Sequence, residues 1–312
     1  MDKLLIENTA LFQDAVTDLT ASPKRMNPKW FYDHIGSVLF EQITQLPEYY
    51  PTRTEVSIFR TQGDKLASYV QDDDILVELG SGASIKTRIL LDEFENLGGY
   101  VPIDISASFL KETAAKLSDD YPNLPVYPVV GDFLGELTLP EKLEASRKVG
   151  FFPGSTIGNL DTAEAIELLK KVRRWDNISA FILGVDLVKD IDVLINAYDD
   201  AAGVTAQFNL NLLSRLNREC GASFDLSKFE HQARWNEELS RIEMHLVSLE
   251  DQTVQLGAVE ITFEAGESIH TESSHKYTKQ SIEDLANRSG WKVNELVADD
   301  DDLFAVAMLQ PV

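Results

Sequence analysis

The sequence predicts an α/β fold in which a Rossmann-like, mostly parallel sheet is accompanied by a second α+β domain. An apolar stretch at residues 75–79 runs directly into two closely spaced glycines, Gly80 and Gly82. Strand-like and helix-like stretches then alternate as far as residue 188, in the order that a parallel sheet requires. The alternation stops after Lys189, and two further strand-like stretches follow only near the end of the chain. We therefore expect an insertion before the last two strands.

The glycine turn has the sequence ELGSG at residues 78–82 and is followed by helical spacing over residues 86–94. Glycine allows a positive φ and lets a ligand approach the backbone closely, so the turn is typical of nucleoside-cofactor loops. The dinucleotide-binding version has a third glycine where this chain has Ile85, which favours a different cofactor. A glycine turn inside some other α/β sheet remains the alternative.

The later strands of the predicted sheet end in residues that could bind such a cofactor. They lie at residues 99–106, 126–133, 148–159 and 179–188. Asp104 lies about twenty residues past the glycines, where a carboxylate typically binds ribose hydroxyls. We expect Asp132 and Phe133 to lie over an adenine, and residues 153–159 form a second glycine-rich turn. Ligands of open α/β sheets bind at this carboxyl edge.

The remaining segments are assigned to the second domain. A helix is expected within residues 1–20, a proline-broken loop follows, and residues 29–55 contain several aromatic side chains around a helix-like centre. The insertion is helical to about Asn217 and then shows the period-two pattern of an antiparallel sheet at residues 241–248, 253–256, 259–264 and 269–277. The last strands are residues 291–297 and 303–309. We predict a cofactor domain of residues 54–188 plus 278–312, and a substrate domain of residues 1–53 plus 189–277.

The amino-acid composition narrows the classes of molecule that the protein could bind. The 312 residues carry 52 acidic and 28 basic side chains, a formal charge of −24, which disfavours nucleic acid. The single cysteine, Cys220, allows no internal disulfide. We find neither a signal peptide nor an apolar stretch long enough to span a membrane. The expectation is a cytoplasmic monomer that binds a small molecule.

With these segments in view, the chain resembles, over essentially its whole length, the histidine-specific Nα-methyltransferases of ergothioneine biosynthesis. These enzymes use S-adenosyl-L-methionine (SAM) and make hercynine. The turn at residues 78–82 is similar to motif I of class I SAM methyltransferases. The other segments that carry the resemblance are residues 29–33, 46–55, 153–159, 197–205 and 271–277.

The resemblance implies a role for individual residues. Tyr49 and Asn159 would hold the substrate α-amino group, and Asn159 and Tyr198 its carboxylate. Glu272 and Ser274 would bind the two imidazole nitrogens. Tyr32 would lie at the junction of cofactor and substrate, with Tyr32 and Tyr49 as the catalytic residues, and Met244 along the imidazole. The SAM-binding residues would be Glu78, Gly80, Ser81, Gly82, Lys86, Asp104, Asp132, Phe133 and Gly154.

Strand geometry is compatible with the assignment of Glu272 and Ser274, because residues two apart in a strand point to one face. A carboxylate acceptor and a hydroxyl there could meet a ring with one N–H and one lone pair. Without the resemblance, two solvent-facing polar residues would be the commoner interpretation, and Met244 would be core filler. The histidines His34, His245, His270 and His275 show no spacing typical of metal ligands, so we assign no metal.

Two other functions remain open from the sequence. The first is a methyltransferase for another aromatic amino acid, tyrosine or tryptophan, although Glu272 argues against an apolar ring. The second is a non-catalytic SAM-binding protein whose second domain recruits a partner enzyme.

Overall fold

The computed structural model describes residues 9–82, 85–94 and 96–312. The first eight residues of the expected N-terminal helix lie outside this part of the chain, as do Ala83 and Ser84 of the glycine turn. The chain divides into two compact units: unit 1 is Met1–Tyr49 with Asp190–Ser273, and unit 2 is Tyr50–Lys189 with Ser274–Val312. The sequence placed these breaks after residues 53, 188 and 277.

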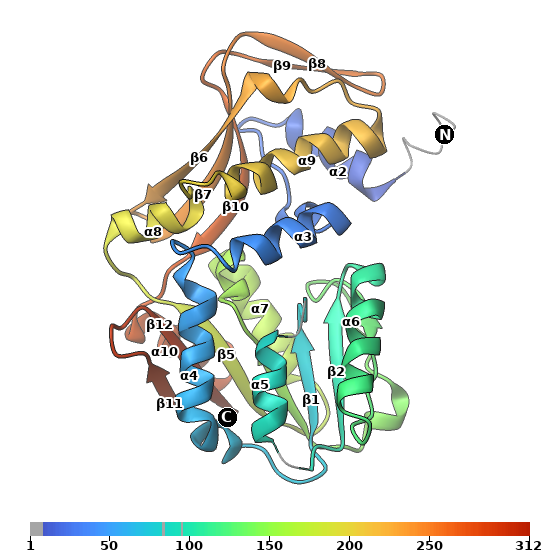
Figure 1. The fold of residues 1–312 in the computed structure, drawn as a ribbon, viewed down its shortest axis with the longest axis vertical. Coiled ribbons are helices and arrows are strands. Elements are labelled where there is room, and N and C mark those ends of the chain that lie inside the picture. The colour runs from blue at the N-terminus through green and yellow to red at the C-terminus, as the bar shows by residue number, and fades with distance from the viewer. Residues whose placement is uncertain (1–8, 83–84, 95) are drawn as a thin grey trace. The chain divides into compact units, whose positions relative to one another are not determined.

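Unit 2 contains a seven-stranded sheet in the order β11-β12-β5-β4-β1-β2-β3 (Figure 1). Its strands are β1 (Ile75–Leu79), β2 (Gly99–Asp104), β3 (Val129–Val130), β4 (Lys148–Phe152), β5 (Ile178–Asp186), β11 (Trp291–Ala298) and β12 (Phe304–Pro311). β3, β2, β1, β4 and β5 are parallel, whereas β12 runs antiparallel to β5 and β11. The predicted Rossmann-like sheet is confirmed.

The third strand is much shorter than the sequence predicted. Only Val129 and Val130 pair with β2, and Val126 makes an isolated bridge to Tyr100. Pro128 lies between them and cannot donate a backbone hydrogen bond, which explains why the pairing is interrupted at this edge of the sheet.

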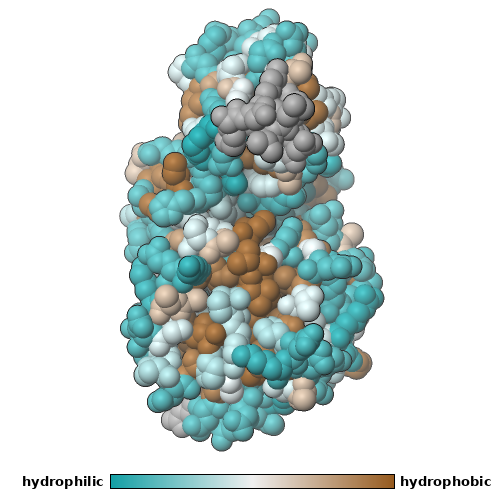
Figure 2. Space-filling view, turned by 90° about the vertical axis from the view of Figure 1, so that its right-hand side faces the viewer, coloured by the Kyte–Doolittle hydropathy of each residue, from teal (hydrophilic) through white to brown (hydrophobic). Residues whose placement is uncertain are grey.

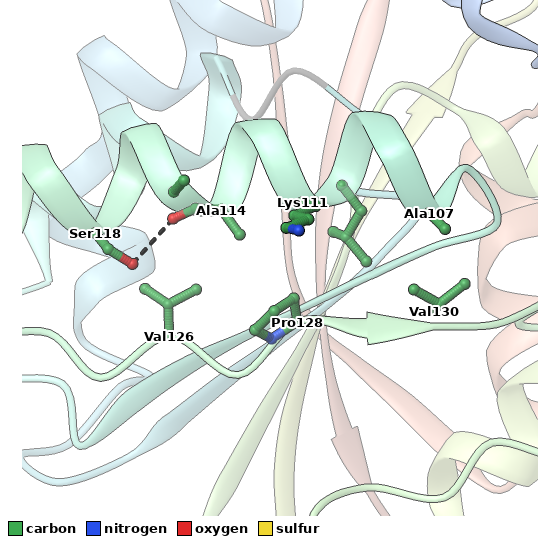
Figure 3. A pocket seen from close by; sticks show the side chains of 9 residues that line it. Ala107, Lys111, Ala114, Ser118, Val126, Pro128 and Val130 are labelled. Atoms are coloured by element: carbon green, nitrogen blue, oxygen red, sulfur yellow. Dashed lines mark hydrogen bonds between the residues drawn. The ribbon is translucent and has the colours of Figure 1, made fainter.

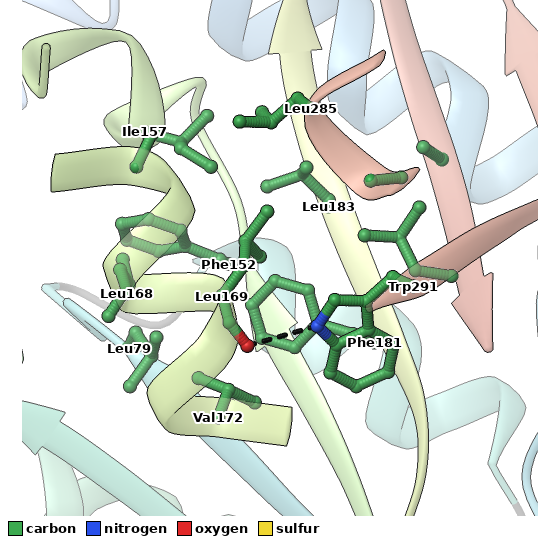
Figure 4. Close-up of a cluster of buried hydrophobic side chains, with 14 of the residues drawn as sticks. Leu79, Phe152, Ile157, Leu168, Leu169, Val172, Phe181, Leu183, Leu285 and Trp291 are labelled. Atoms are coloured by element: carbon green, nitrogen blue, oxygen red, sulfur yellow. Dashed lines mark hydrogen bonds between the residues drawn. The ribbon is translucent and has the colours of Figure 1, made fainter. Parts of the chain in front are cut away.

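Helices cover both faces of the unit 2 sheet. One face packs against α7 (Thr162–Arg173) and α10 (Lys279–Arg288), and the other against α4 (Tyr50–Ala67), α5 (Ile85–Glu93) and α6 (Ala107–Asp120). In the core under α7 and α10, the Trp291 indole N–H donates to the carbonyl of Leu169 at 3.0 Å (Figure 4). Phe181 lies so close to Gly150 that a Cβ there would be 2.2 Å from its ring. This close packing fixes β4 against β5, and therefore the positions of the turns that follow them.

Unit 1 combines helices with two small sheets. The helical segments are α2 (Ala10–Leu19), η1 (Pro28–Phe31), α3 (His34–Ile43), α8 (Ile191–Tyr198), α9 (Val204–Cys220) and η4 (Leu226–Lys228). The strands are β6 (Phe229–Asn236), β7 (Arg241–Ser248), β8 (Gln252–Leu256), β9 (Val259–Phe263) and β10 (Ser268–His275). They form a sheet of order β10-β7-β6 and a separate β8-β9 ribbon, rather than one sheet.

Two details of unit 1 differ from expectation. β6 was missed because most of its side chains are half-buried, with no clean alternation of buried and exposed positions to indicate a strand. α9 continues to Cys220, slightly beyond the expected end, and stops at Gly221, whose φ of 63° is the left-handed conformation that ends many helices.

Candidate active site

The glycine turn after β1 is held against the end of β2. The backbone N–H groups of Gly80 and Ser81 donate to the carbonyl of Ile103 at 2.8 and 3.0 Å. Gly82 N–H donates to Asp104 Oδ2 at 3.0 Å, and Ser106 N–H donates to Oδ1 at 2.9 Å. Gly80 and Gly82 have φ values of 67° and 48°, which glycine adopts without strain. The turn and the predicted ribose-binding acid therefore form one structural unit.

Asp104 is half-buried, and burial raises the pKa of its carboxyl while the backbone N–H groups of Ser106 and Gly82 oppose that shift. Oδ2 accepts from Gly82 N–H and Oδ1 from Ser106 N–H, and the backbone N–H of Ile105 also lowers this pKa. An ionised carboxylate has about four lone-pair positions, which leaves room for a ligand. A Cβ at Gly82 would meet no atom within 4 Å, so the backbone is open to close approach. These are the features that a ribose-binding turn requires.

Glu78, by contrast, is directed into unit 2. Its side chain is 1% exposed and accepts hydrogen bonds from Thr87 Oγ1 at 2.6 Å and from the Tyr100 hydroxyl. Burial raises the pKa of Glu78 to about 8, although the bonds from Thr87 and Tyr100 partly offset this. The side chain connects the start of α5 to β2.

Of the two residues expected over an adenine, Phe133 lies beside the same turn. Asp132 Oδ1 accepts from Leu134 N–H at 2.8 Å. The Phe133 ring packs edge-on against Phe152 at 5.2 Å, and a Cβ at Gly80 would lie 3.8 Å from it. Although β3 is short, the structure still brings Phe133 to the glycine turn.

Lys86 and Gly154 are joined by a residue that the sequence did not single out. The Glu55 carboxylate is fully buried, pairs with Lys86 Nζ at 2.6 Å, and accepts from Gly154 N–H at 2.9 and 3.0 Å. A Cβ at Gly154 would lie 2.9 Å from Lys86 Nζ. The position of Glu55 within α4, on the same face as the buried Ile58 and Phe59, was the signal available.

Asn159 and Ser274 belong to neighbouring segments of unit 2. Asn159 ends the short helix η3 (Thr156–Asn159) after β4. At Gly158, just before it, a Cβ would lie 2.8 Å from the carbonyl oxygen of His275. The close approach allowed by this glycine therefore places the η3 turn directly against the end of β10, where Ser274 lies.

Ser274 contacts a buried network of charged side chains that the sequence did not predict. Asp186, 1% exposed, accepts from Lys276 Nζ at 2.7 Å and from the Tyr50 hydroxyl at 2.7 and 2.8 Å. Lys189 also pairs with Asp186, and Lys276 donates to Ser274 Oγ at 2.8 Å. Burial would raise the pKa of Asp186, but the charges of Lys276 and Lys189 outweigh it and lower that pKa. An acid at the carboxyl end of β5 and a lysine two residues past Ser274 were the available signals.

Three of the predicted site residues form an aromatic cluster in unit 1. Tyr32 packs edge-on against Phe40 and Phe208, with ring centroids 5.8 Å apart in each case. Tyr49 packs against Phe40 at 6.3 Å and against Tyr198, the last residue of α8, at 6.2 Å. The structure thus brings Tyr32, Tyr49 and Tyr198 together around apolar rings.

Met244 and Glu272 lie on the adjacent strands β7 and β10 of unit 1. Met244 is 2% exposed and Glu272 8%. The hydroxyl of Thr271, the neighbour of Glu272, donates to the Met244 carbonyl at 3.0 Å, which fixes the two strands side by side here. Glu272 is therefore not the solvent-facing acid that the sequence pattern alone would favour.

Three potential metal ligands also meet on this sheet, although the sequence spacing suggested none. Ligand atoms of Glu243, His245 and His270 lie within 4.8 Å of one another. Arg241 Nη2 pairs with Glu243 at 2.6 Å, and the other Glu243 oxygen lies 3.2 Å from His245 Nε2. His270 Nε2 is 3.0 Å from the carbonyl of Glu272. These mutual contacts and the arginine charge account for the cluster, and we assign no metal to it.

A groove of about 490 Å³ lies elsewhere on unit 2, along α6 (Figure 3). Figure 2 shows hydrophobic surface on the side that faces the viewer. Val130, one of the residues that line the groove, is an exposed apolar side chain. The groove is lined mainly by apolar side chains, and it includes none of the predicted site residues.

The sheet order, with its antiparallel last strand, and the glycine turn beside Asp104 define a class I SAM-dependent methyltransferase. The sequence profile of the family described as "Histidine-specific methyltransferase, SAM-dependent" matches residues 11–311. The chain belongs to this family, and SAM is its cofactor. Within the described residues, no helix combines the length and the apolar character needed to cross a membrane.

Two bacterial relatives are similar to this chain over most of their length, and a fungal relative over part of its length. The histidine N-alpha-methyltransferase of Mycolicibacterium smegmatis is 46% identical over 281 residues, covering 88% of this chain and 86% of the relative. The enzyme of the same name from Mycobacterium tuberculosis is 45% identical, with the same coverage. Ergothioneine biosynthesis protein 1 of Schizosaccharomyces pombe is 27% identical, covering 84% of this chain and 36% of that longer protein.

Proposed function

We propose that this protein transfers three methyl groups from SAM to the α-amino nitrogen of L-histidine, giving hercynine, a step of ergothioneine biosynthesis. The observation that carries the proposal is the pair Glu272 and Ser274, which are 8% and 3% exposed and two residues apart in β10. Residues two apart in a strand point to one face, so this carboxylate and this hydroxyl can meet the two nitrogens of one imidazole ring. The histidine methyltransferase names of the relatives support the same substrate.

SAM and the amino acid would be bound by different sets of residues. Unit 2 would bind SAM through the glycine turn and through Lys86, Asp104, Asp132, Phe133 and Gly154. Unit 1 would bind most of the amino acid, with Tyr49 at the amine, Tyr198 at the carboxylate and Met244 along the ring. Asn159 would contact the α-amino group and the carboxylate, Ser274 would contact the ring, and Tyr32 would lie where substrate and cofactor meet.

The main task of the protein in methyl transfer is to position the amine relative to the methyl group of SAM. SAM supplies an electrophilic methyl group, so the residues of this chain must hold a neutral amine lone pair in line behind it. An α-ammonium is largely protonated near neutrality, and its proton must be lost before each transfer. Oxygens of Tyr49 and Asn159 can orient the neutral amine and let water remove the proton. The aromatic walls of Tyr32 and Tyr49 suit the growing cation.

The direct test is incubation of the purified protein with excess SAM and, in parallel, histidine, tyrosine or tryptophan, followed by mass analysis of the amino acid. We expect histidine alone to be converted efficiently, with three SAM consumed per trimethylated product. Accumulation of the monomethyl product at saturating SAM would refute trimethylation. Preferred conversion of tyrosine or tryptophan would refute the substrate, and no transfer to any of them would favour a non-catalytic SAM-binding role.

We also propose that the protein acts as a cytoplasmic monomer. The one cysteine, Cys220, is buried, and burial raises the pKa of its thiol to about 11, so it is poorly suited to disulfide chemistry. Cell fractionation tests the compartment. Light scattering after size exclusion tests the monomer, and a mass of twice 34.9 kDa would contradict it.

A further inference from the structure

The buried lysine behind Ser274 carries an inference that rests on the proposed function and goes beyond it. Lys276 is fully buried and donates to Ser274 Oγ at 2.8 Å and to Asp186 Oδ2 at 2.7 Å. An ammonium only donates hydrogen bonds, so in both contacts Lys276 is the donor. The Ser274 oxygen thus already receives a charged hydrogen bond from inside unit 2.

That contact determines what Ser274 can offer a ligand. A hydroxyl that accepts from a cation is polarised, which makes its own O–H a better donor and its oxygen a poorer acceptor. Ser274 is therefore suited to a ring nitrogen with a lone pair and poorly suited to an N–H. Glu272, two residues away, is suited to the opposite partner, because an ionised carboxylate only accepts.

The charges around Lys276 act in the same direction. Two lysines, Lys276 and Lys189, share the single carboxylate of Asp186, and Tyr50 from α4 adds a neutral hydroxyl. Ser155 is also neutral, and its hydroxyl oxygen accepts a hydrogen bond from the backbone N–H of Asp186 at 2.9 Å. Asp299, in the loop after β11, acts on Lys189 from a distance. Lys276 Nζ thus places a positive charge 2.8 Å from Ser274 Oγ, and a positive charge this near disfavours a cationic ring at Ser274.

We propose that Lys276 is a positioning residue that fixes Ser274 as a hydrogen donor, so that the site takes the histidine ring in its neutral form, with N–H toward Glu272 and lone pair toward Ser274. Without Lys276, the carboxylate of Glu272 would instead favour the imidazolium. Lys276 would therefore control the ring's protonation state without touching the reacting nitrogen.

The test uses hercynine as the ligand, because its trimethylated amine cannot titrate and only its imidazole changes charge between pH 5.5 and 8. Its binding to the protein with S-adenosylhomocysteine is measured by calorimetry across that range. For wild type we expect a constant affinity above the ring pKa of about 6.5 and a loss approaching tenfold per pH unit below it. In Lys276→Met, binding at pH 8 should weaken and the loss toward low pH should disappear or reverse. Lys276→Gln, which keeps a neutral donor to Ser274, should restore part of the preference.

Controls separate this role from a merely structural one. Lys279→Met removes an exposed lysine of the same unit and should leave both affinity and its pH dependence unchanged. S-adenosylhomocysteine affinity reports folding of each variant. If Lys276→Met does not fold, the proton balance of hercynine binding to the wild-type protein at pH 6 tests the proposal. We expect binding to release protons into the buffer, and proton uptake would overturn the proposal.

Different results would refute the proposed function and the proposed role of Lys276. A wild-type protein that neither methylates histidine nor binds hercynine refutes the proposed function. A wild-type protein that methylates histidine while Lys276→Met keeps the wild-type pH dependence of hercynine binding refutes only the role of Lys276.

Discussion

Three buried carboxylates of unit 2, those of Glu55, Glu78 and Asp186, each hold a different part of the site. Glu55 joins Lys86 to Gly154, Glu78 connects α5 to β2, and Asp186 binds Lys276. The sequence predicts a cofactor role for Glu78 because this residue belongs to a glycine motif. Glu55 and Asp186 could not be predicted in this way, because each acid finds its partners in distant segments that sequence spacing does not reveal.

Asp104 gives the first prediction at this scale. Asp104→Ala should weaken SAM binding by about 1.5–3 kcal/mol for each ribose hydrogen bond lost, because these bonds are made to a charged acceptor. Calorimetric titration with SAM measures the change, and Asp119→Ala, at an exposed position of α6, is the matched control. Unchanged SAM affinity in Asp104→Ala would place the ribose elsewhere.

Glu78 gives a prediction about pH. Its pKa rises from 4.5 to about 8 on folding because burial disfavours the charged form. The stability that this group contributes is thus complete below pH 4.5 and is lost as the pH rises through about 8. Relative to Glu78→Gln, wild type should lose on the order of a few kcal/mol of unfolding free energy across that interval. Urea unfolding of both proteins at several pH values measures it, and parallel stability curves would contradict the assignment.

At the scale of elements, the sequence predicted the segments with regular patterns and failed where the pattern was mixed. The strands from β1 to β5 and the last two strands were found because apolar stretches alternate with helical spacing. β6 was missed because half-buried side chains leave no period, and β3 was drawn too long because Pro128 interrupts the pairing. The roles predicted for residues at the ends of strands rest on two grounds. One is that open α/β sheets bind ligands at the carboxyl ends of their strands, and the other is the resemblance to a known family.

The turn after β4 supports a prediction at this scale. Gly154 has a φ of 75°, and a Cβ there would lie 2.9 Å from Lys86 Nζ. Gly154→Ala should therefore displace Lys86 from Glu55 and weaken SAM binding by roughly tenfold, or about 1.4 kcal/mol. Gly266→Ala is the matched control, because that glycine also has a positive φ, 86°, but no atom near its missing Cβ. Equal SAM affinity in the two variants would show that only backbone strain matters.

At the scale of the whole molecule, the predicted site residues are divided between two compact units. The sequence could identify the cofactor half from physical rules, because glycines and acids at the carboxyl edge of a parallel sheet have recognisable spacing. It could identify the substrate half only by resemblance. Tyr32, Tyr49, Tyr198, Met244 and Glu272 are scattered along the chain, and their side chains are typical of core or surface until the fold places them.

The most direct measurement of the central claim is the substrate preference of Glu272→Ala. A site built to hydrogen-bond a polar ring can reject a ring without that group by about 10⁴–10⁵, because its own buried groups would be left unpaired. Removing the Glu272 carboxylate removes both an acceptor for histidine and that penalty for a phenol or indole. The preference should shift further when Met244→Val makes room for a larger ring.

We therefore predict that kcat/KM for histidine falls by roughly 10²-fold or more in Glu272→Ala, with a relative gain for tyrosine or tryptophan, while SAM affinity stays normal. The measurement is kcat/KM for all three amino acids in wild type, Glu272→Ala, Met244→Val and the double variant. An undiminished preference for histidine in Glu272→Ala, with normal SAM binding, would contradict the account, because the imidazole would then be recognised by other residues.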